Sequence, residues 1–269
     1  MRSNHPTPNC VYTNTHLPLI LGVSGASGLI YAVRALKFLL DAGYTVELVA
    51  SKSTHMVWQS EQNIRMPVEP AEQEQFWRQQ AKVEQNGKLC CHPWSDIGAN
   101  IASGSFRTQG MIVMPCSMST VAKLASGLSS DLLERSADVQ LKEGRQLVIV
   151  PRETPFSLIH LRNLTALAEA GARIVPAIPA WYHHPQTIED LVDFVVARAL
   201  DQLDIDCVPI QRWQGEKGTR GQGKADAAPG GSLQENVGDK GTRGQGESRE
   251  QGGLFLELGE HEESGGKIR

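Results

Sequence analysis

Short apolar segments with the length of buried strands alternate with amphipathic segments between residues 17 and 213. Gly43 and Gly171 stand where a left-handed cap would end a helix. Strands that are apolar on both faces and joined by helices predict a doubly wound, mostly parallel sheet with helices on both faces. The expected strands are 17–23, 44–50, 111–115, 147–150 and 172–175, and the expected helices are 29–42, one from about 116 to Gly127, 131–142, 155–170 with Pro155 in its first turn, and one after Pro185.

Composition divides the chain into three parts. Residues 214–269 hold 15 of the 26 glycines and repeat the heptapeptide KGTRGQG, so they predict a low-complexity, disordered tail that cannot bury a core. Residues 1–16 are polar and lack the apolar stretch of a signal peptide, which predicts a disordered extension. One folded domain is expected over residues 17–213.

Charge and hydropathy exclude several classes of protein. A net charge of -4 and a pI near 6.1 argue against nucleic-acid binding, since such binders carry a basic surface. The apolar runs are far shorter than the roughly 18 to 20 residues that span a bilayer, so no membrane span is expected. The five cysteines are odd in number and form no CxxC motif, which favours the cytoplasm.

The carboxyl ends of parallel strands meet at one edge of a sheet, where ligands of doubly wound folds bind. Four segments should meet there, at 24–28, 51–52, 115–120 and 152–153. The first is a glycine-rich turn at a helix start, which suits a phosphate. The glycine spacing is not GxGxxG, and no acidic residue follows the second strand, so FMN is favoured over NAD in a Rossmann-like or flavodoxin-like fold. No Tyr-x-x-x-Lys motif supports a short-chain dehydrogenase.

Arg152 and Glu153 leave a buried strand together at this edge, and we interpret them as functional instead of as a structural ion pair. Cys116 has no neighbouring group to activate it and is expected to be a packed side chain. The histidines offer no set of metal ligands at suitable spacing, so we expect no metal site. The histidines considered for such a site are His92, His160, His183 and His184.

The motifs GASG, PCS, PRE-P and YH-P occur in this order along the chain. Through these motifs, residues 19–213 resemble the UbiX-type flavin prenyltransferases. Gly144 and Gln146 depart from the family pattern. The resemblance implies a metal-independent transferase that joins a dimethylallyl group from dimethylallyl monophosphate to N5 and C6 of reduced FMN. The prenylated FMN would serve a UbiD-type decarboxylase, and the chain would form a homo-oligomer, a dodecamer by the same resemblance.

Matching the motifs position by position assigns roles to single residues. The resemblance implies catalytic proton transfer by Ser27, Glu61 and Glu153. It implies FMN binding by Gly25, Ala26, Ser27, Ser51, Ser117 and Arg152. It implies binding of the prenyl phosphate by Lys142, Tyr182 and Arg198, with Trp213 as an aromatic wall. These types suit the reaction, because cations stabilise the leaving phosphate while an aromatic wall shelters the allylic cation.

Two alternatives remain open from the sequence. One is a flavin-dependent cysteine decarboxylase of the same fold, which would need a catalytic histidine and an asparagine that the segment Pro115 to Met118 lacks. The other is a non-catalytic FMN-binding protein, which would not need the second phosphate site implied by Lys142 and Tyr182.

Overall fold

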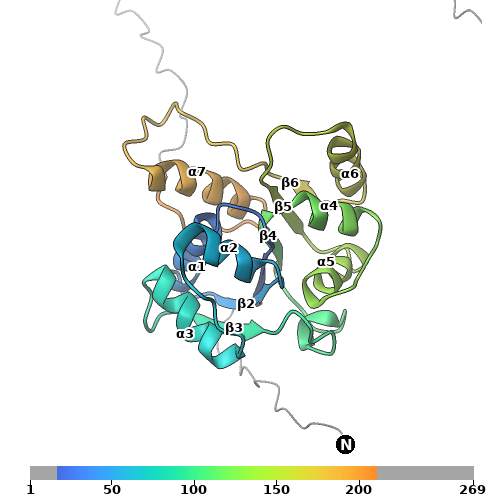
Figure 1. Ribbon diagram of the computed structural model, residues 1–269, viewed down its shortest axis with the longest axis horizontal. Coiled ribbons are helices and arrows are strands. Elements are labelled where there is room, and N and C mark those ends of the chain that lie inside the picture. The colour runs from blue at the N-terminus through green and yellow to red at the C-terminus, as the bar shows by residue number, and fades with distance from the viewer. Residues whose placement is uncertain (1–16, 211–269) are drawn as a thin grey trace, which may run out of the picture. The chain divides into compact units, whose positions relative to one another are not determined.

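Strands from both halves of the domain form one six-stranded sheet in the order β3-β2-β1-β4-β5-β6, and every neighbouring pair is parallel (Figure 1). The computed structural model describes residues 17–210. The strands are β1 (Leu19–Val23), β2 (Thr45–Ala50), β3 (Lys88–His92), β4 (Gly110–Cys116), β5 (Leu147–Pro151) and β6 (Arg173–Ile174). The predicted doubly wound parallel sheet is therefore confirmed.

Helices cover both faces of this sheet (Figure 1). Helices α1, α3 and α7 pack on one face, whereas α4, α5 and α6 pack on the other. Helix α2 follows β2 at the carboxyl edge. The helices are α1 (Ile30–Asp41), α2 (Thr54–Gln62), α3 (Pro70–Ala81), the 3-10 turn η1 (Asn100–Ala102), α4 (Met118–Ala125), α5 (Leu132–Lys142), α6 (Leu158–Glu169) and α7 (Ile188–Asp201).

Burial on both faces explains why the strands are apolar at consecutive positions. In β1, Leu19 and Leu21 pack into the core beneath α1 and α7, whereas Ile20 between them faces the core beneath α4 and α5. Every residue of β1, β2, β4 and β5 is buried. Strands with this pattern have no solvated face, which is why β1, β4 and β5 show no polar alternation.

Some expected boundaries were wrong. Strand β1 begins at Leu19, and Leu17 is exposed. Helix α6 begins at Leu158 instead of in the turn that contains Pro155, because Ser157 caps it. The Ser157 hydroxyl accepts a hydrogen bond from His160 N, and His160 Nδ1 accepts one from Ser157 N, which forms a capping box.

The sequence prediction contained no elements between residues 53 and 110, where the structure has α2, α3 and β3. Strand β3 reads KLCCH, a short mixed segment with no strand periodicity. Three aromatic side chains, Trp58, Phe76 and Trp77, pack edge to face with ring centroids 5.1 to 6.0 Å apart and fix α2 and α3 to the core. These elements therefore form through tertiary packing that no local pattern reveals.

The strand order places a switch point between β1 and β4, because the chain runs outward from β1 to β3 and then returns to β4 on the other side. Ligands of doubly wound sheets bind at the carboxyl ends of the strands beside such a point. None of the described helices combines the length and the hydropathy that a membrane crossing requires.

Candidate functional site

The turns that follow β1, β2, β4 and β5 are tied together at the carboxyl edge, and we call these turns (24–28, 51–54, 115–120 and 152–153) the turn cluster. Ser24 Oγ donates a hydrogen bond to the carbonyl oxygen of Pro115 at 3.1 Å and accepts one from Ser117 N at 2.7 Å. Arg152 N donates to the carbonyl oxygen of Cys116 at 3.1 Å. The structure thus brings together the four segments expected at this edge.

The turn after β2 is joined to the end of β1 through one carbonyl group. The carbonyl oxygen of Val23 accepts hydrogen bonds from Ser51 N and from Thr54 Oγ1, both at 2.8 Å. Ser51 Oγ is 3.1 Å from Thr54 Oγ1, and both residues are buried. A Cβ atom at Gly25 would lie only 2.2 Å from Ser53 Oγ, so this close approach of the two turns requires glycine.

Arg152 and Glu153 form no ion pair with each other, although they are adjacent. Arg152 Nε donates to the carbonyl oxygen of Ser27 at 2.9 Å, and Arg152 takes part in none of the ion pairs between described residues. The Glu153 carboxylate accepts a hydrogen bond from Thr154 N at 3.0 Å. Both side chains are half-buried. A half-buried cation and carboxylate without mutual pairing are available to a ligand, which supports the functional interpretation.

The carboxylate of Glu61 occupies the start of α1. Glu61 Oε1 accepts a hydrogen bond from Gly28 N at 2.7 Å, and Oε2 accepts one from Leu29 N at 3.2 Å. A negative charge is favourable at this place because it interacts with the positive end of the helix dipole. The sequence predicted a phosphate at this glycine-rich turn, where the amide of Gly28 and that of Leu29 directly after it already donate to Glu61.

The start of α4 offers amides for an anion instead. Ser117 caps this helix, and its Oγ accepts a hydrogen bond from Thr120 N at 3.2 Å. The amides of Met118 and Ser119, in the first turn, have no acceptor within the helix. Together with the guanidinium of Arg152 and the close approach at Gly25, these donors fit an anionic ligand with a phosphate group, such as FMN.

Ala26, Ser27, Ser51 and Ser117 also lie in the turn cluster, as the sequence predicted. Ser27 is exposed, Ser117 is half-buried, and Ala26 and Ser51 are buried. These residues of the cluster therefore range from solvent-facing side chains to buried supports. Their contacts with a ligand remain predictions.

Lys142 lies at the opposite edge of the sheet from the turn cluster. It is the last residue of α5 and precedes the start of β5, whereas Arg152 follows the end of β5. Nearby, Arg145 donates to the carbonyl oxygens of Gly104 and Phe106, which precede β4. A five-residue strand spans about 17 Å, so one chain does not bring Lys142 to Arg152.

Arg198 and Tyr182 lie in or before α7. Arg198 Nη1 pairs with Asp201 Oδ2 at 2.9 Å near the end of this helix. Tyr182 lies in the loop before α7, is 42% exposed and packs edge to face on Phe194. This loop leaves the carboxyl edge, since Ala177 N donates to the carbonyl oxygen of Pro151 at the end of β5. Trp213 lies outside the described residues.

Cys116 is fully buried, and burial raises the pKa of its thiol. This confirms it as a packed side chain, since a nucleophilic cysteine needs a lowered pKa. The described residues contain no cluster of three potential metal ligands. His92 Nε2 instead pairs with the buried Glu47 Oε2 at 2.5 Å, and His160 belongs to the capping box of α6.

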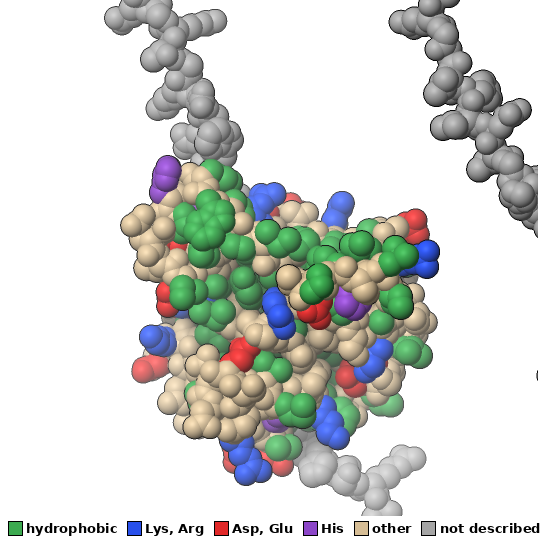
Figure 2. All heavy atoms as spheres, turned by 45° about the horizontal axis from the view of Figure 1, so that its top comes forward, with side chains coloured by type: hydrophobic (Ala, Val, Ile, Leu, Met, Phe, Trp, Pro, Cys, Tyr) green, Lys and Arg blue, Asp and Glu red, His purple; other side chains and the backbone are tan. Residues whose placement is uncertain are grey.

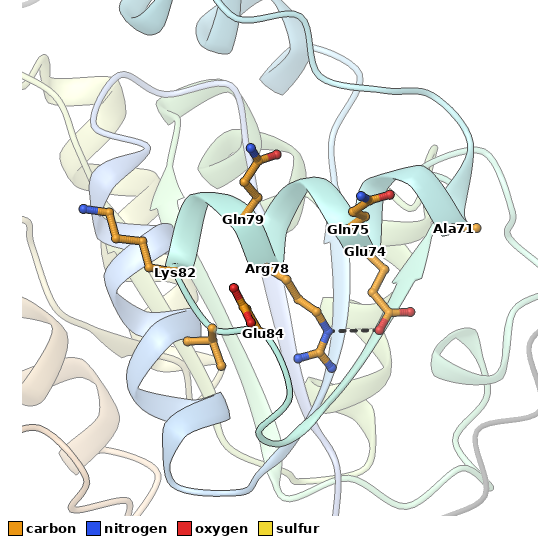
Figure 3. A pocket seen from close by; sticks show the side chains of 8 residues that line it. Ala71, Glu74, Gln75, Arg78, Gln79, Lys82 and Glu84 are labelled. Atoms are coloured by element: carbon orange, nitrogen blue, oxygen red, sulfur yellow. Dashed lines mark hydrogen bonds and ion pairs between the residues drawn. The ribbon is translucent and has the colours of Figure 1, made fainter.

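A hollow of about 820 Å³ is lined by α3 and the residues that follow it (Figure 3), and none of its lining residues belongs to the turn cluster. The ion pair between Arg78 and Glu74, 3.1 Å long, crosses its lining, and the labelled side chains are mostly polar. Nothing in its lining matches the predicted ligand chemistry. The lining residues are Ala71, Glu74, Gln75, Arg78, Gln79, Lys82, Val83 and Glu84.

Two buried hydroxyl groups of the turn cluster, those of Ser24 and Thr54, were not among the predicted site residues. Both are fully buried and bind backbone atoms of neighbouring turns. The only sequence signal is a hydroxyl residue directly after, or four positions after, a buried strand. Such a signal is too common to identify a supporting residue without the tertiary structure.

Comparison with known proteins decides the family. Residues 10–200 match the sequence model of the Flavoprotein family. The flavin prenyltransferase UbiX of Synechocystis sp. is 77% identical over 198 residues, which cover 74% of this chain and 96% of that protein. The chain belongs to the UbiX family of flavin prenyltransferases. The UbiX of Halalkalibacterium halodurans is 42% identical over 73% of this chain and 93% of its own length.

Solved structures of the UbiX family have the same fold. AnUbiX (PadA1), solved in complex with FMN and dimethylallyl pyrophosphate, matches with a TM-score of 0.65 and 39% identity, covering 74% of this chain and 98% of its own. A dodecameric FMN-dependent UbiX-like decarboxylase from Escherichia coli O157:H7 matches with a TM-score of 0.64 and 41% identity, covering 74% and 100%. The predicted family is confirmed, and the enzyme is a transferase of the flavoprotein class.

Proposed function

We propose that the chain transfers a dimethylallyl group from dimethylallyl monophosphate to reduced FMN, at N5 and C6, without a metal. The observation that carries this proposal is the placement of Arg152 and Glu153, unpaired with each other, beside the start of α4 in a member of the UbiX family. A cation, a carboxylate and helix-terminal amides are the groups that transfer from an allylic phosphate needs.

FMN would bind in the turn cluster. The amides at the start of α4, the hydroxyls of Ser51 and Ser117 and the Arg152 guanidinium would hold its phosphate and ribityl chain, and Gly25 to Ser27 would line its ring. Bound reduced FMN supplies the nucleophilic ring positions that accept the prenyl group. The chain's own residues orient it and exclude water.

The two carboxylates have different surroundings, which supports different roles. Glu61 accepts two backbone hydrogen bonds and fixes the start of α1, so it would position Ser27 and the rest of the turn after β1. Among the described residues, the Glu153 carboxylate accepts a hydrogen bond only from Thr154 N, at Oε1, which leaves Oε2 available to move a proton between the flavin and the leaving phosphate. Ser27, exposed in the turn after β1, would assist as a donor.

The substrate phosphate would be bound by Tyr182 together with Lys142 and Arg198. Because Lys142 lies at the opposite edge of the sheet, it would reach this site only from a second copy of the chain. A homo-oligomer agrees with an exposed apolar surface, visible as green side chains over α6 and the loop before α7 in Figure 2. The exposed apolar residues of α6, of this loop and of the first turn of α7 are Leu158, Ile159, Leu161, Ile178, Trp181 and Ile188. Trp213 would complete the apolar wall.

The product, prenylated FMN, would pass to a UbiD-type decarboxylase. The cytoplasmic location stays a prediction, because the described cysteines are not all in the same redox state. Cys91, Cys116 and Cys207 are free thiols, whereas Cys90 is disulfide-bonded.

The test is to incubate the full chain anaerobically with reduced FMN and dimethylallyl monophosphate, extract the flavin and measure its mass. We expect the flavin to gain the mass of one dimethylallyl group, with no change when EDTA is added. Parallel reactions contain dimethylallyl pyrophosphate, which separates the two phosphate esters, or a peptide with a C-terminal cysteine, which tests the decarboxylase alternative. An unchanged flavin mass with both esters would contradict the proposal, and FMN that binds without any reaction would indicate a binding protein.

A further inference from the structure

We infer that Ser24 is a positioning residue for the flavin, because its buried hydroxyl joins the turn after β1 to the turn after β4. The inference rests on the proposed function only in taking FMN as the ligand of the turn cluster. Ser24 is 0% exposed, so it cannot itself contact a ligand. Its effect must pass through the residues that it holds.

Ser24 acts where the regular pairing of the two strands ends. The last paired residues of β1 and β4 are Gly22 and Val113, and the pairing of β4 with β5 shifts register between Val113 and Cys116. Pro115 has no N–H group and offers only its carbonyl oxygen to a neighbour. Both Ser24 N, at 3.2 Å, and Ser24 Oγ, at 3.1 Å, donate to that oxygen, which extends the connection between the strands beyond the ladder.

The same hydroxyl also fixes the next turn. Ser24 Oγ accepts a hydrogen bond from Ser117 N at 2.7 Å, which satisfies an amide that no helical partner can satisfy. With its backbone held in this way, Ser117 caps α4 through the bond from Thr120 N to its Oγ. The amides of Met118 and Ser119 follow directly, so the direction in which they point depends on Ser24.

Removing the Ser24 hydroxyl would leave Ser117 N without an acceptor in a buried environment, which is unfavourable. The turn after β4 would then move to find another partner. Since the amides at the start of α4 are the expected phosphate donors, FMN binding should weaken although no group that touches FMN has been removed. A purely structural serine would instead change stability and leave the affinity for FMN unchanged.

The experiment compares Ser24→Ala with Ser136→Ala. Ser136, on α5, provides a matched control, because it is also 0% exposed but its Oγ has no hydrogen-bond partner between residues 17 and 210. FMN affinity is measured by quenching of flavin fluorescence, at a temperature where each variant is folded. We expect the Kd for FMN to rise by about tenfold or more in Ser24→Ala and to stay at the parent value in Ser136→Ala. Ser24→Thr keeps the hydroxyl group and should therefore bind FMN with the affinity of the parent protein.

A second readout does not involve FMN. Hydrogen exchange of the segment 115–120 in the protein without flavin should be faster in Ser24→Ala than in the parent, and unchanged in Ser136→Ala. If Ser24→Ala does not fold, Ser24→Cys carries the same expectations, because a thiol has the shape of the hydroxyl group but is only a weak hydrogen-bond donor and acceptor.

Parent-like FMN affinity in Ser24→Ala would overturn the inference, and so would an equal loss in Ser136→Ala. Neither readout requires prenyl transfer. A failure of the proposed reaction would therefore leave this result unaffected, and the two failures can be distinguished.

Discussion

Arg152 Nε donates a hydrogen bond of 2.9 Å to the carbonyl oxygen of Ser27, two residues that stand 125 positions apart in the chain. The bond reaches from the end of β5 to the turn after β1, across β4, which lies between these strands. It uses Nε and leaves the two terminal nitrogens of the guanidinium for a ligand. The Arg152 side chain thereby holds the turn after β1 in place and presents a positive charge beside it.

Replacing Arg152 with alanine should weaken FMN binding by about tenfold or more, since both the bond to Ser27 and a charge-assisted phosphate contact are lost. Arg152→Lys should recover only part of the affinity for FMN. Lysine has a single side-chain nitrogen, so it cannot bind the carbonyl oxygen of Ser27 with one nitrogen and the ligand with another. Flavin fluorescence titration measures both variants. Arg65→Ala, at an exposed position, serves as the control. Full affinity in Arg152→Lys would show that only the charge matters.

Replacing Glu61 with alanine should lower the free energy of unfolding by about 0.5 to 2 kcal/mol, the usual effect of losing a helix cap. The amides of Gly28 and Leu29 would lose their acceptor, and FMN affinity should fall as the turn loosens. Glu61→Gln keeps one oxygen acceptor and should lie between parent and alanine. Thermal unfolding and FMN titration are compared with Gln62→Ala, the exposed neighbour. Equal stability of Glu61→Ala and the control would refute the capping role.

Replacing Glu153 with glutamine should leave FMN binding intact and slow prenyl transfer by about 10² or more, because shape is kept while the transferable proton is lost. The measurement is the steady-state rate of prenylated-flavin formation at saturating substrates. Glu169→Gln, exposed at the end of α6, should behave as the parent. A full rate in Glu153→Gln would exclude the proton-transfer role.

Replacing Lys142 with alanine should raise KM for dimethylallyl monophosphate by about tenfold or more, without changing the Kd for FMN. Stability should change little, since the pair with Glu143 is exposed. Lys37→Ala, at a half-buried lysine that is also paired with a carboxylate, is the control.

The geometry also predicts complementation between subunits. Oligomers mixed from Lys142→Ala and Glu153→Gln chains should be more active than either variant alone, because some sites would then receive both native side chains. Mixed oligomers without any gain would mean that Lys142 does not act across subunits.

The stability of the protein should fall at alkaline pH because of buried thiols. Burial raises the pKa of Cys116, so the folded protein keeps this proton while the unfolded chain loses it above about pH 8.5. Because the pKa of the thiol is higher in the folded state, its contribution to the free energy of unfolding is complete below the pKa of the unfolded chain. This contribution disappears as the pH rises. At pH 10 the loss is about 2 kcal/mol per such thiol.

Thermal unfolding of the parent and of Cys116→Ser at pH 7.5 and pH 10 measures this effect. The serine variant removes the ionisation, so its stability should fall less between the two pH values. Identical decreases in both proteins would show that the Cys116 thiol is not protected in the folded state.

The sheet and the turn cluster could be predicted because their signals are local. Strands β1, β4 and β5 are continuous apolar runs, and the segments that carry Gly25, Ser117 and Arg152 follow them directly. Parallel strands end at one edge, so the sequence alone determined that these residues meet. Strand β3 escaped prediction, because its mixed sequence is buried only through contacts with β2 and α3.

The tertiary structure alone decided how far each site residue is from the others. The motifs assigned Lys142 and Arg152 to one substrate, yet the length of β5 separates them in a single chain, and sequence order does not reveal to which edge a helix end belongs. It also decided that the Glu61 carboxylate binds the amides before α1, and that the Ser24 hydroxyl joins two turns. Local patterns fix which segments are strands and turns. Hydrogen bonds between residues 33 or 93 positions apart depend on packing that no local pattern contains.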